Sequence, residues 1–343
     1  MNGRLRDDEV VVGGDARQRY YDSRGYGRPL DGNEIALSRV EAAHLLLRGD
    51  LDSVAEMNFH EFLQEATGDG FAARFLVYAD LRERGFYLSP DRSEWVTDPL
   101  ADSDFVVYPR GSGPWDDEVL YRLRVASERE TIPASRLGDV VLAIVDEESE
   151  ITYFETDRTE ISGTTNHDAP TNISGSLLAD RVLVWDAPDE LHRESFYGQP
   201  MGGRNPAGVL QLSLVEAAHL VAEGNLSVSG GYDEIVTRGR DVEGERFDRR
   251  LYVYRKLREQ NVVPKTGFKF GADFRTYADV ESVDELGHSE FLIRVVRGGH
   301  AFSPRDLALD VRLAHGVRKK MIFALVAENE RITDWLSVTR LTP

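Results

Sequence analysis

Three residues in the stretch 266–321 have side chains that could move protons and stabilise negative charge. Tyr277 closes the segment GADFRTY, His288 opens HSEFLIRVV, and Lys319 lies in HGVRKKM. Each has an ordinary structural explanation when taken singly: a strand-end tyrosine in the core, a surface histidine, and a lysine that favours a helix dipole. Together they offer a proton acceptor, a proton donor and a cation, so we interpret them as a candidate catalytic triad.

The sequence lacks the motifs of several other hydrolytic mechanisms. It contains no cysteine, no HExxH and no Gly-x-Ser-x-Gly elbow. RNA supplies its own nucleophile, the 2′-hydroxyl, and its cleavage then needs a base, an acid and a cation. An imidazole titrates near neutrality, which suits His288 as the acid. Tyrosine hydroxyls ordinarily titrate near pH 10, so nearby cations would have to assist Tyr277 as the base.

The charge of the chain is strongly negative. Sixty acidic residues oppose 41 basic ones, giving a formal net charge of −19, and the few lysines all lie in the last third of the chain. Such a surface is typical of proteins from a cytoplasm with molar salt, although an ordinary acidic protein is the alternative. Acidity alone disfavours a nucleic-acid partner, whereas the local clustering of lysines favours one. With no apolar run near the roughly 18 residues of a membrane span, we expect a cytoplasmic protein without a membrane partner.

The chain is an internal duplication. The segment LSRVEAAHLLLRGDL at 37–51 recurs as LSLVEAAHLVAEGNL at 212–226. Apolar residues at helical spacing follow a serine that precedes a glutamate by three positions, which predicts a helix with a capping box in each copy. A period of about 170–180 residues is far longer than that of a solenoid repeat.

The predicted fold is mixed α/β (α+β). Each repeat has an α/β N-terminal subdomain and a small nuclease-like α/β C-terminal subdomain, with apolar strands covered by helices. The predicted boundaries are 1–70 and 71–155 for the first repeat, 156–172 for a polar linker, and 173–245 and 246–343 for the second repeat.

The two C-terminal subdomains differ at the candidate triad. Tyr108 of the first copy matches Tyr277, but Glu118 stands where the second copy has His288. The offset between copies then grows from 170 to 181 residues, so the first copy lacks most of ALDVRLAHGVRKK and has no counterpart of Lys319. We infer that the first copy is non-catalytic and that the second carries the site.

The segments KTGFKFGADFRTY, HSEFLIRVV and VRLAHGVRKKM resemble the signature of the archaeal tRNA-splicing endonuclease, and the two-copy layout is similar to its tandem-repeat, homodimeric form. The resemblance implies cleavage of precursor tRNA at bulge–helix–bulge sites, giving 2′,3′-cyclic phosphate and 5′-hydroxyl ends without metal or other cofactor. It assigns Tyr277 as the general base, His288 as the general acid and Lys319 as the transition-state cation, with Lys320 as the alternative lysine.

The resemblance also implies contacts outside the triad. It implies that an arginine of each active unit stacks on a flipped bulge base. Arg312 fits this role best, and Arg340 is the second candidate. A helix-surface ion pair with Asp310 is the structural alternative for Arg312. The acidic loop 146–148 (Asp146, Glu147 and Glu148) would dock into a basic groove of the partner chain in a homodimer, or else be a solvated turn.

Two other classes of protein remain to be distinguished. A non-catalytic RNA-binding or scaffold protein could keep the same fold. A metal-dependent nuclease is disfavoured because no Asp…Glu-x-Lys arrangement lies near Tyr277.

Overall fold

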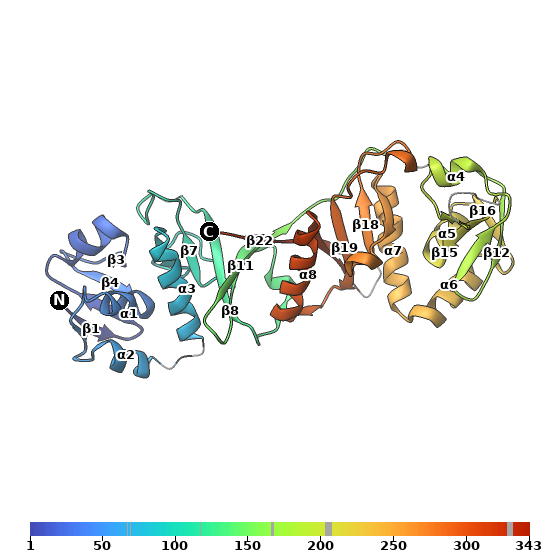
Figure 1. The fold of residues 1–343 in the computed structure, drawn as a ribbon. Coiled ribbons are helices and arrows are strands. Elements are labelled where there is room, and N and C mark those ends of the chain that lie inside the picture. Colours follow the sequence, from blue (N-terminus) through green and yellow to red (C-terminus); the bar gives the residue numbers. More distant parts are fainter. Residues whose placement is uncertain (67, 69, 117, 166–167, 203–207, 328–331) are drawn as a thin grey trace.

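A computed structural model describes residues 1–343 except 67, 69, 117, 166–167, 203–207 and 328–331. The molecule is elongated: the two N-terminal subdomains lie at opposite ends, and the sheets of the two C-terminal subdomains join between them (Figure 1). The predicted mixed α+β class is confirmed.

The two N-terminal subdomains share one topology. Each has a five-stranded sheet in which antiparallel strands are extended by one short parallel strand. In the first copy the strand order is β3 (Arg28–Pro29), β4 (Ile35–Ser38), β2 (Glu9–Val12), β1 (Asn2–Arg6) and β5 (Ser53–Val54), with a π-helical turn Arg17–Asp22 and helices α1 (Arg39–Leu47) and α2 (Phe59–Glu65). In the second copy it is β14 (Gln199–Pro200), β15 (Leu210–Ser213), β13 (Arg181–Val184), β12 (Ile173–Leu177) and β16 (Leu226–Val228), with helices α4 (Asp189–Arg193), α5 (Leu214–Ala222) and α6 (Gly231–Glu243).

The predicted capping boxes begin α1 and α5. Ser38 and Ser213 each accept a hydrogen bond from the backbone N–H three residues on, and the glutamates there, Glu41 and Glu216, reach back to the serine N–H. These bonds satisfy backbone donors that a helix start leaves open, so the same local sequence produces the same helix start twice.

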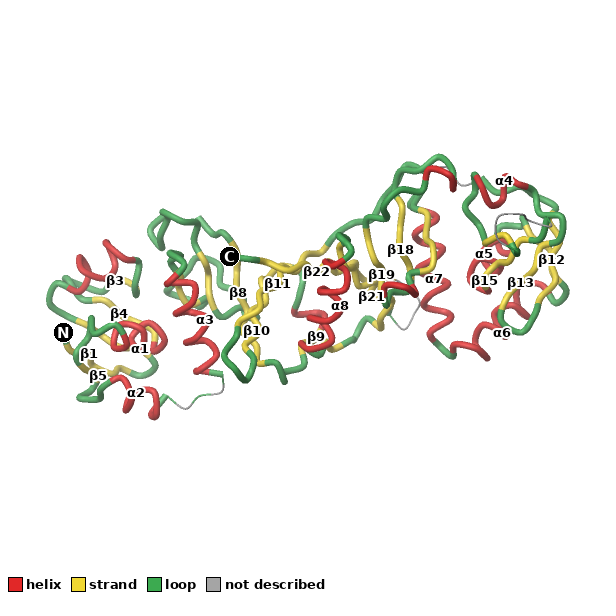
Figure 2. The backbone as a smooth tube through the Cα atoms, viewed as in Figure 1, coloured by secondary structure: helices red, strands yellow, loops and turns green. Residues whose placement is uncertain are grey.

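The two C-terminal subdomains form one ten-stranded sheet. Its order is β17 (Val263–Thr266), β18 (Phe274–Tyr277), β19 (Phe291–Arg297), β21 (Lys320–Val326), β22 (Ile332–Leu341), β11 (Ile151–Arg158), β10 (Asp139–Val145), β8 (Tyr121–Ser127), β7 (Phe105–Val107) and β6 (Leu88–Pro90). A short ladder of β9 (Ile132–Pro133) and β20 (Ala301–Phe302) pairs the copies a second time (strands are yellow in Figure 2).

The copies meet at a pseudo-twofold axis between β11 and β22. These strands are antiparallel, and Thr156 pairs with Val338 while Asp157 pairs with Ser337. The counterpart of a β11 residue in the second copy lies 181 positions later in β22, so Thr156 corresponds to Ser337 and Asp157 to Val338. Exchanging the two copies therefore converts each of these pairs into the other. Each copy therefore presents the same edge to the other, which is the isologous arrangement of a symmetric dimer built within one chain.

Helices cover both faces of the shared sheet. In the second copy, α7 (Arg246–Glu259) packs on Ile293, Ile322 and Ala324, and in the first copy α3 (Phe71–Glu83) packs on the equivalent face. On the opposite face, α8 (Pro304–Gly316) packs in a cluster that runs across the copy junction, from Phe323 to Phe154.

The first copy differs where α8 lies in the second. Its chain makes a single 3-10 turn, Ala134–Arg136, in the corresponding place. Most of the segment ALDVRLAHGVRKK, which the first copy largely lacks, lies in α8.

Candidate active site

The topology of the sheet brings the triad to one edge. Tyr277 is the last residue of β18, His288 lies just before β19, and Lys319 immediately precedes β21. Strands β19 and β21 run parallel, whereas β18 runs antiparallel to β19. The end of β18 and the beginnings of β19 and β21 therefore meet at the same edge.

Hydrogen bonds join the neighbours of the three residues. The N–H of Glu290 donates to the carbonyl oxygen of Thr276 over 3.2 Å, and the N–H of Lys320 donates to the carbonyl oxygen of Glu290 over 3.2 Å. The Lys319 ammonium donates to the carbonyl oxygen of Ser289 over 2.7 Å. The backbone thus links the three triad positions within one connected strand-end network.

Tyr277 and His288 have different environments. Tyr277 is 5% exposed and packs in a small apolar cluster with Phe196 and Val263. His288 is exposed, so its imidazole is accessible to a bound substrate. The Arg275 guanidinium lies 5.8 Å from the centre of the Tyr277 ring, which places a fixed cation next to the candidate base.

Lys319 is a cation held in a partly buried position. Burial lowers the pKa of Lys319, and the nearby positive charge of Arg275 lowers this pKa further. Its ammonium also lies 5.8 Å from the centre of the Phe270 ring. Neither Arg275 nor Phe270 was among the sequence candidates, although Arg275 precedes Tyr277 by two positions and so shares its face of the strand.

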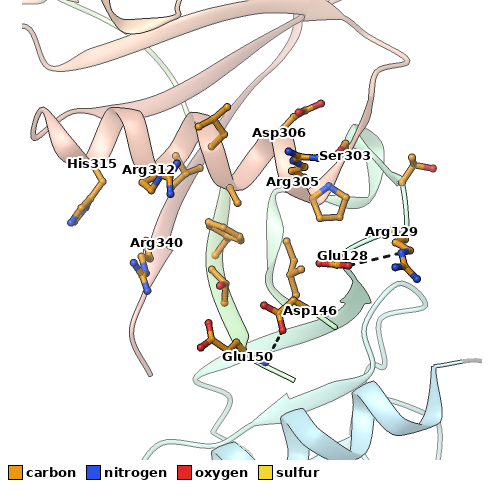
Figure 3. A pocket seen from close by; sticks show the side chains of 18 residues that line it. Glu128, Arg129, Asp146, Glu150, Ser303, Arg305, Asp306, Arg312, His315 and Arg340 are labelled. Carbon is orange, nitrogen blue, oxygen red and sulfur yellow. Dashed lines mark hydrogen bonds and ion pairs between the residues drawn. The ribbon is translucent and has the colours of Figure 1, made fainter. Parts of the chain in front are cut away.

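Arg312 and Arg340 come together in a separate groove. It has a volume of about 980 Å³ and lies between α8 and the β10–β11 region of the first copy. Arg312 and His315 reach it from α8 and Arg340 reaches it from β22, while Asp146 and Glu150 line the other side (Figure 3). The side of the groove from the second copy is mainly basic, although Asp306 also lines it, and the side from the first copy is mainly acidic, although Arg129 also lines it. No triad residue lines the groove.

Asp310, the partner of Arg312 in the ion-pair alternative, already pairs with another arginine. The Asp310 carboxylate is hydrogen-bonded by Arg294, on β19. Burial raises the pKa of Asp310, and the attraction of Arg294 opposes that rise. Arg312 is exposed and faces the groove.

The acidic loop 146–148 is an ordered turn between β10 and β11. The Asp146 side chain accepts hydrogen bonds from the N–H groups of Glu148 and Glu150, at 2.9 and 2.8 Å. Glu147 pairs with Arg129, and Glu148 is exposed. Asp146 therefore stabilises the turn, which leaves Glu147 and Glu148 as the acids that project from it.

The first copy has a tyrosine at the position of Tyr277 but neither the histidine nor the lysine of the candidate triad. Tyr108 is 3% exposed and follows β7 as Tyr277 ends β18. Glu118, at the place of His288, accepts a hydrogen bond from the Ser112 hydroxyl over 3.3 Å.

The described residues show neither a candidate metal site nor a membrane-spanning helix. Within the described residues, no three His, Asp or Glu side chains form a group that could hold a metal ion. Among the helices that the structure describes, none is long and apolar enough to cross a membrane.

Comparison with protein families assigns both parts of the second repeat and the N-terminal part of the first repeat. Residues 247–334, which include the triad, match the tRNA intron endonuclease catalytic C-terminal domain. Residues 1–63 and 173–238 each match the tRNA intron endonuclease N-terminal domain. The chain belongs to the tRNA-splicing endonuclease family. The sequence resemblance, and with it the prediction of an endonuclease, is confirmed.

Relatives of this family extend over the whole chain. The chain is 61% identical to a tRNA-splicing endonuclease of Natronomonas pharaonis, covering 100% of both chains. It is 58% identical to one of Haloarcula marismortui and 34% identical to one of Methanosarcina barkeri, covering 99% of both chains in each case. The Natronomonas and Haloarcula relatives come from halophilic archaea, which supports the predicted halophilic origin.

Proposed function

We propose that this protein excises introns from precursor tRNA by metal-independent attack of a 2′-hydroxyl at bulge–helix–bulge sites. The observation that supports this most directly is the meeting of Tyr277, His288 and Lys319 at one sheet edge, inside the stretch that matches the catalytic domain. RNA supplies the nucleophile, so the reaction needs only a base, an acid and a cation from the protein.

The proposed reaction is a single transesterification. The Tyr277 oxygen accepts the proton of the 2′-hydroxyl, and the 2′-oxygen forms a bond to the adjacent phosphorus. The bond from phosphorus to the 5′-oxygen breaks, and His288 donates a proton to that oxygen. Lys319 stabilises the negative charge that develops on the phosphoryl oxygens. The products are a 2′,3′-cyclic phosphate and a 5′-hydroxyl.

The substrate contacts and assembly are part of the proposal. Arg312 and Arg340 stack on unpaired bulge bases, because a guanidinium plane can pack on a base that has left its helix. Two chains form a homodimer in the cytoplasm, with the acidic loop 146–148 of one chain against a basic groove of the other. Stacking keeps part of its strength at high salt, whereas phosphate pairing weakens through counterion release.

The test is cleavage of a bulge–helix–bulge RNA in high salt with EDTA, comparing wild type with His288→Ala and mapping both product ends. Cyclic-phosphate ends that disappear in the variant would support the reaction and the acid. Cleavage that EDTA abolishes would contradict the metal-independent mechanism.

A non-catalytic RNA-binding or scaffold role is the second candidate. The first copy shows that this fold can persist after losing the histidine and lysine positions. Binding of the RNA without cleavage by the wild-type protein would favour that role.

A further inference from the structure

Phe196 has an unusual backbone conformation for a bulky residue. Its φ is +62°, in the left-handed region that favours glycine because a Cβ there crowds the backbone. Its side chain is fully buried. A strained, fully buried aromatic residue is maintained only where the surrounding structure holds it, and such residues concentrate at functional sites.

Two cations of the catalytic subdomain hold the turn that contains Phe196. Arg258, on α7, donates to the carbonyl oxygen of Ser195 over 3.0 Å. Lys265, on β17, donates to the carbonyl oxygens of Phe196 and Gly198 over 2.8 and 3.2 Å. These hydrogen bonds fix the turn 195–198, in the N-terminal subdomain of the second copy, to the C-terminal subdomain that carries the candidate triad.

The Phe196 ring lies in the same buried cluster as the candidate base. It forms one buried cluster with Val263 and Tyr277. Val263 and Tyr277 are themselves directly opposite each other in the β17–β18 pair. The ring therefore crosses the subdomain boundary and lies in the cluster at the strand end where the Tyr277 side chain is placed.

The first copy has the same turn without this ring. Gly25 occupies the position of Phe196 with a φ of +63°, and Arg82 donates to the carbonyl oxygen of Arg24 over 2.8 Å, as Arg258 does to Ser195. A Cβ on Gly25 would lie 2.8 Å from Cδ2 of Tyr87, the counterpart of Val263. Where the first copy has Gly25 and Tyr87, the second copy therefore has Phe196 and Val263.

The second cation is also confined to the catalytic copy. At the position of Lys265 the first copy has Ser89, which is buried. The less strained residue occurs where the triad is incomplete, and the strained aromatic with its additional lysine occurs where the triad is complete. Folding of the turn alone does not explain this difference, since the first copy makes the same turn with glycine.

We propose that Phe196 is a positioning residue for Tyr277: held by Lys265 and Arg258, its ring fixes the tyrosine side chain in the orientation that cleavage requires. This inference rests on the proposed function, in which Tyr277 is the base. A small displacement of a reacting group can reduce the rate of a reaction by roughly 100-fold.

The test uses the full-length protein and single-turnover cleavage of a bulge–helix–bulge RNA. Phe196→Leu keeps an apolar side chain, and the pair Phe196→Gly with Val263→Tyr installs the combination with which the first copy folds. Both are expected to lower the cleavage rate by roughly 10- to 100-fold while the Kd for RNA stays unchanged. Phe247→Leu, at a fully buried phenylalanine at the other end of α7, is the matched control for lost packing and should cleave at the wild-type rate.

A Tyr277→Phe background separates positioning from general damage. If Phe196 acts through the tyrosine hydroxyl, adding Phe196→Leu to Tyr277→Phe lowers the rate no further. A multiplicative further loss, wild-type cleavage by both Phe196 variants, or equal loss in Phe247→Leu would overturn the inference. Wild-type cleavage by Tyr277→Phe itself would instead overturn the proposed role of Tyr277, on which the inference depends.

Discussion

The Lys319 ammonium and the Ser289 carbonyl oxygen are joined by a hydrogen bond of 2.7 Å. Ser289 is buried and directly follows His288. The bond therefore ties the strand start that carries the candidate acid to the candidate cation. It also distinguishes Lys319 from its neighbour Lys320, which is exposed and forms part of β21.

Replacing Lys319 with alanine should remove most of the activity. The variant loses the cation proposed to stabilise the phosphoryl oxygens, so we expect single-turnover cleavage to fall by roughly 100- to 1,000-fold. Lys320→Ala is the matched control, because it removes the same charge one residue away. Comparable losses in the two variants would contradict the assignment to Lys319.

Replacing Arg312 with lysine should separate stacking from charge. Lysine keeps the positive charge but lacks the planar guanidinium, so we expect the Kd for bulge–helix–bulge RNA to rise by roughly 3- to 30-fold. The salt dependence of binding should stay unchanged, since the number of cations is unchanged. Arg305→Lys, at another position on the same groove, is the control. A changed salt slope without weaker binding would contradict stacking.

Replacing Arg158 with methionine should weaken the junction between the copies. Arg158, on β11, pairs with Asp334 on β22 and donates to the carbonyl oxygens of Ala134 and Leu137. Its removal leaves partly buried acceptors without a donor, so we expect the free energy of unfolding in urea to fall by about 1–3 kcal/mol. Arg4→Met, which breaks the exposed pair with Glu34, should change it by at most about 0.5 kcal/mol. Equal changes would argue against a role for Arg158 at the junction.

The buried glutamates of the two N-terminal subdomains have pKa values shifted in opposite directions. Burial raises the pKa of Glu41 to about 7. Burial also acts on Glu216, but the attraction of Lys265 and hydrogen bonds from Ser213 and Gly198 outweigh it, so the pKa of Glu216 lies below its ordinary 4.5. The first copy has Ser89 where Lys265 lies, which removes one of the opposing charges.

Acid should open the N-terminal subdomain of the second copy before that of the first. Burial lowers the pKa of His44 and of His219 from the ordinary 6.5 to about 4. Each neutral histidine therefore contributes to the free energy of unfolding above pH 6.5, and this contribution is lost as the pH falls from 6.5 toward 4. The raised pKa of Glu41 has the opposite sign and adds stability as pH falls from 7 to 4.5, whereas Glu216 provides no such offset.

Hydrogen exchange between pH 7 and 4.5 measures this difference. Corrected for the intrinsic exchange rate, protection of 212–226 should fall more steeply than protection of 37–51. Glu41→Gln removes the offset, so protection of 37–51 should then fall with a similar slope. Parallel loss of protection in the wild-type copies would contradict the opposing shifts.

Local sequence patterns were sufficient for the duplication, the helix starts and the triad candidates. The capping boxes at Ser38 and Ser213 depend on residues three positions apart, so the chain encodes them without distant partners. The loss of α8 from the first copy was readable as a change in offset between the repeats. The meeting of Tyr277, His288 and Lys319 was expected from the family resemblance and is explained by the direction of three neighbouring strands.

Contacts between distant segments were decided only by the tertiary structure. Nothing in the strand patterns specifies that β11 pairs with β22 to make one sheet, because an edge strand can pair with any suitable edge. The pairing brings Arg312 and Arg340 to a groove with Asp146, and the docking of the subdomains places Phe196 in one buried cluster with Tyr277. The sequence alone determined which residues could do the chemistry, whereas packing determined what surrounds them, because side chains far apart in the chain become neighbours only when the sheet and its subdomains assemble.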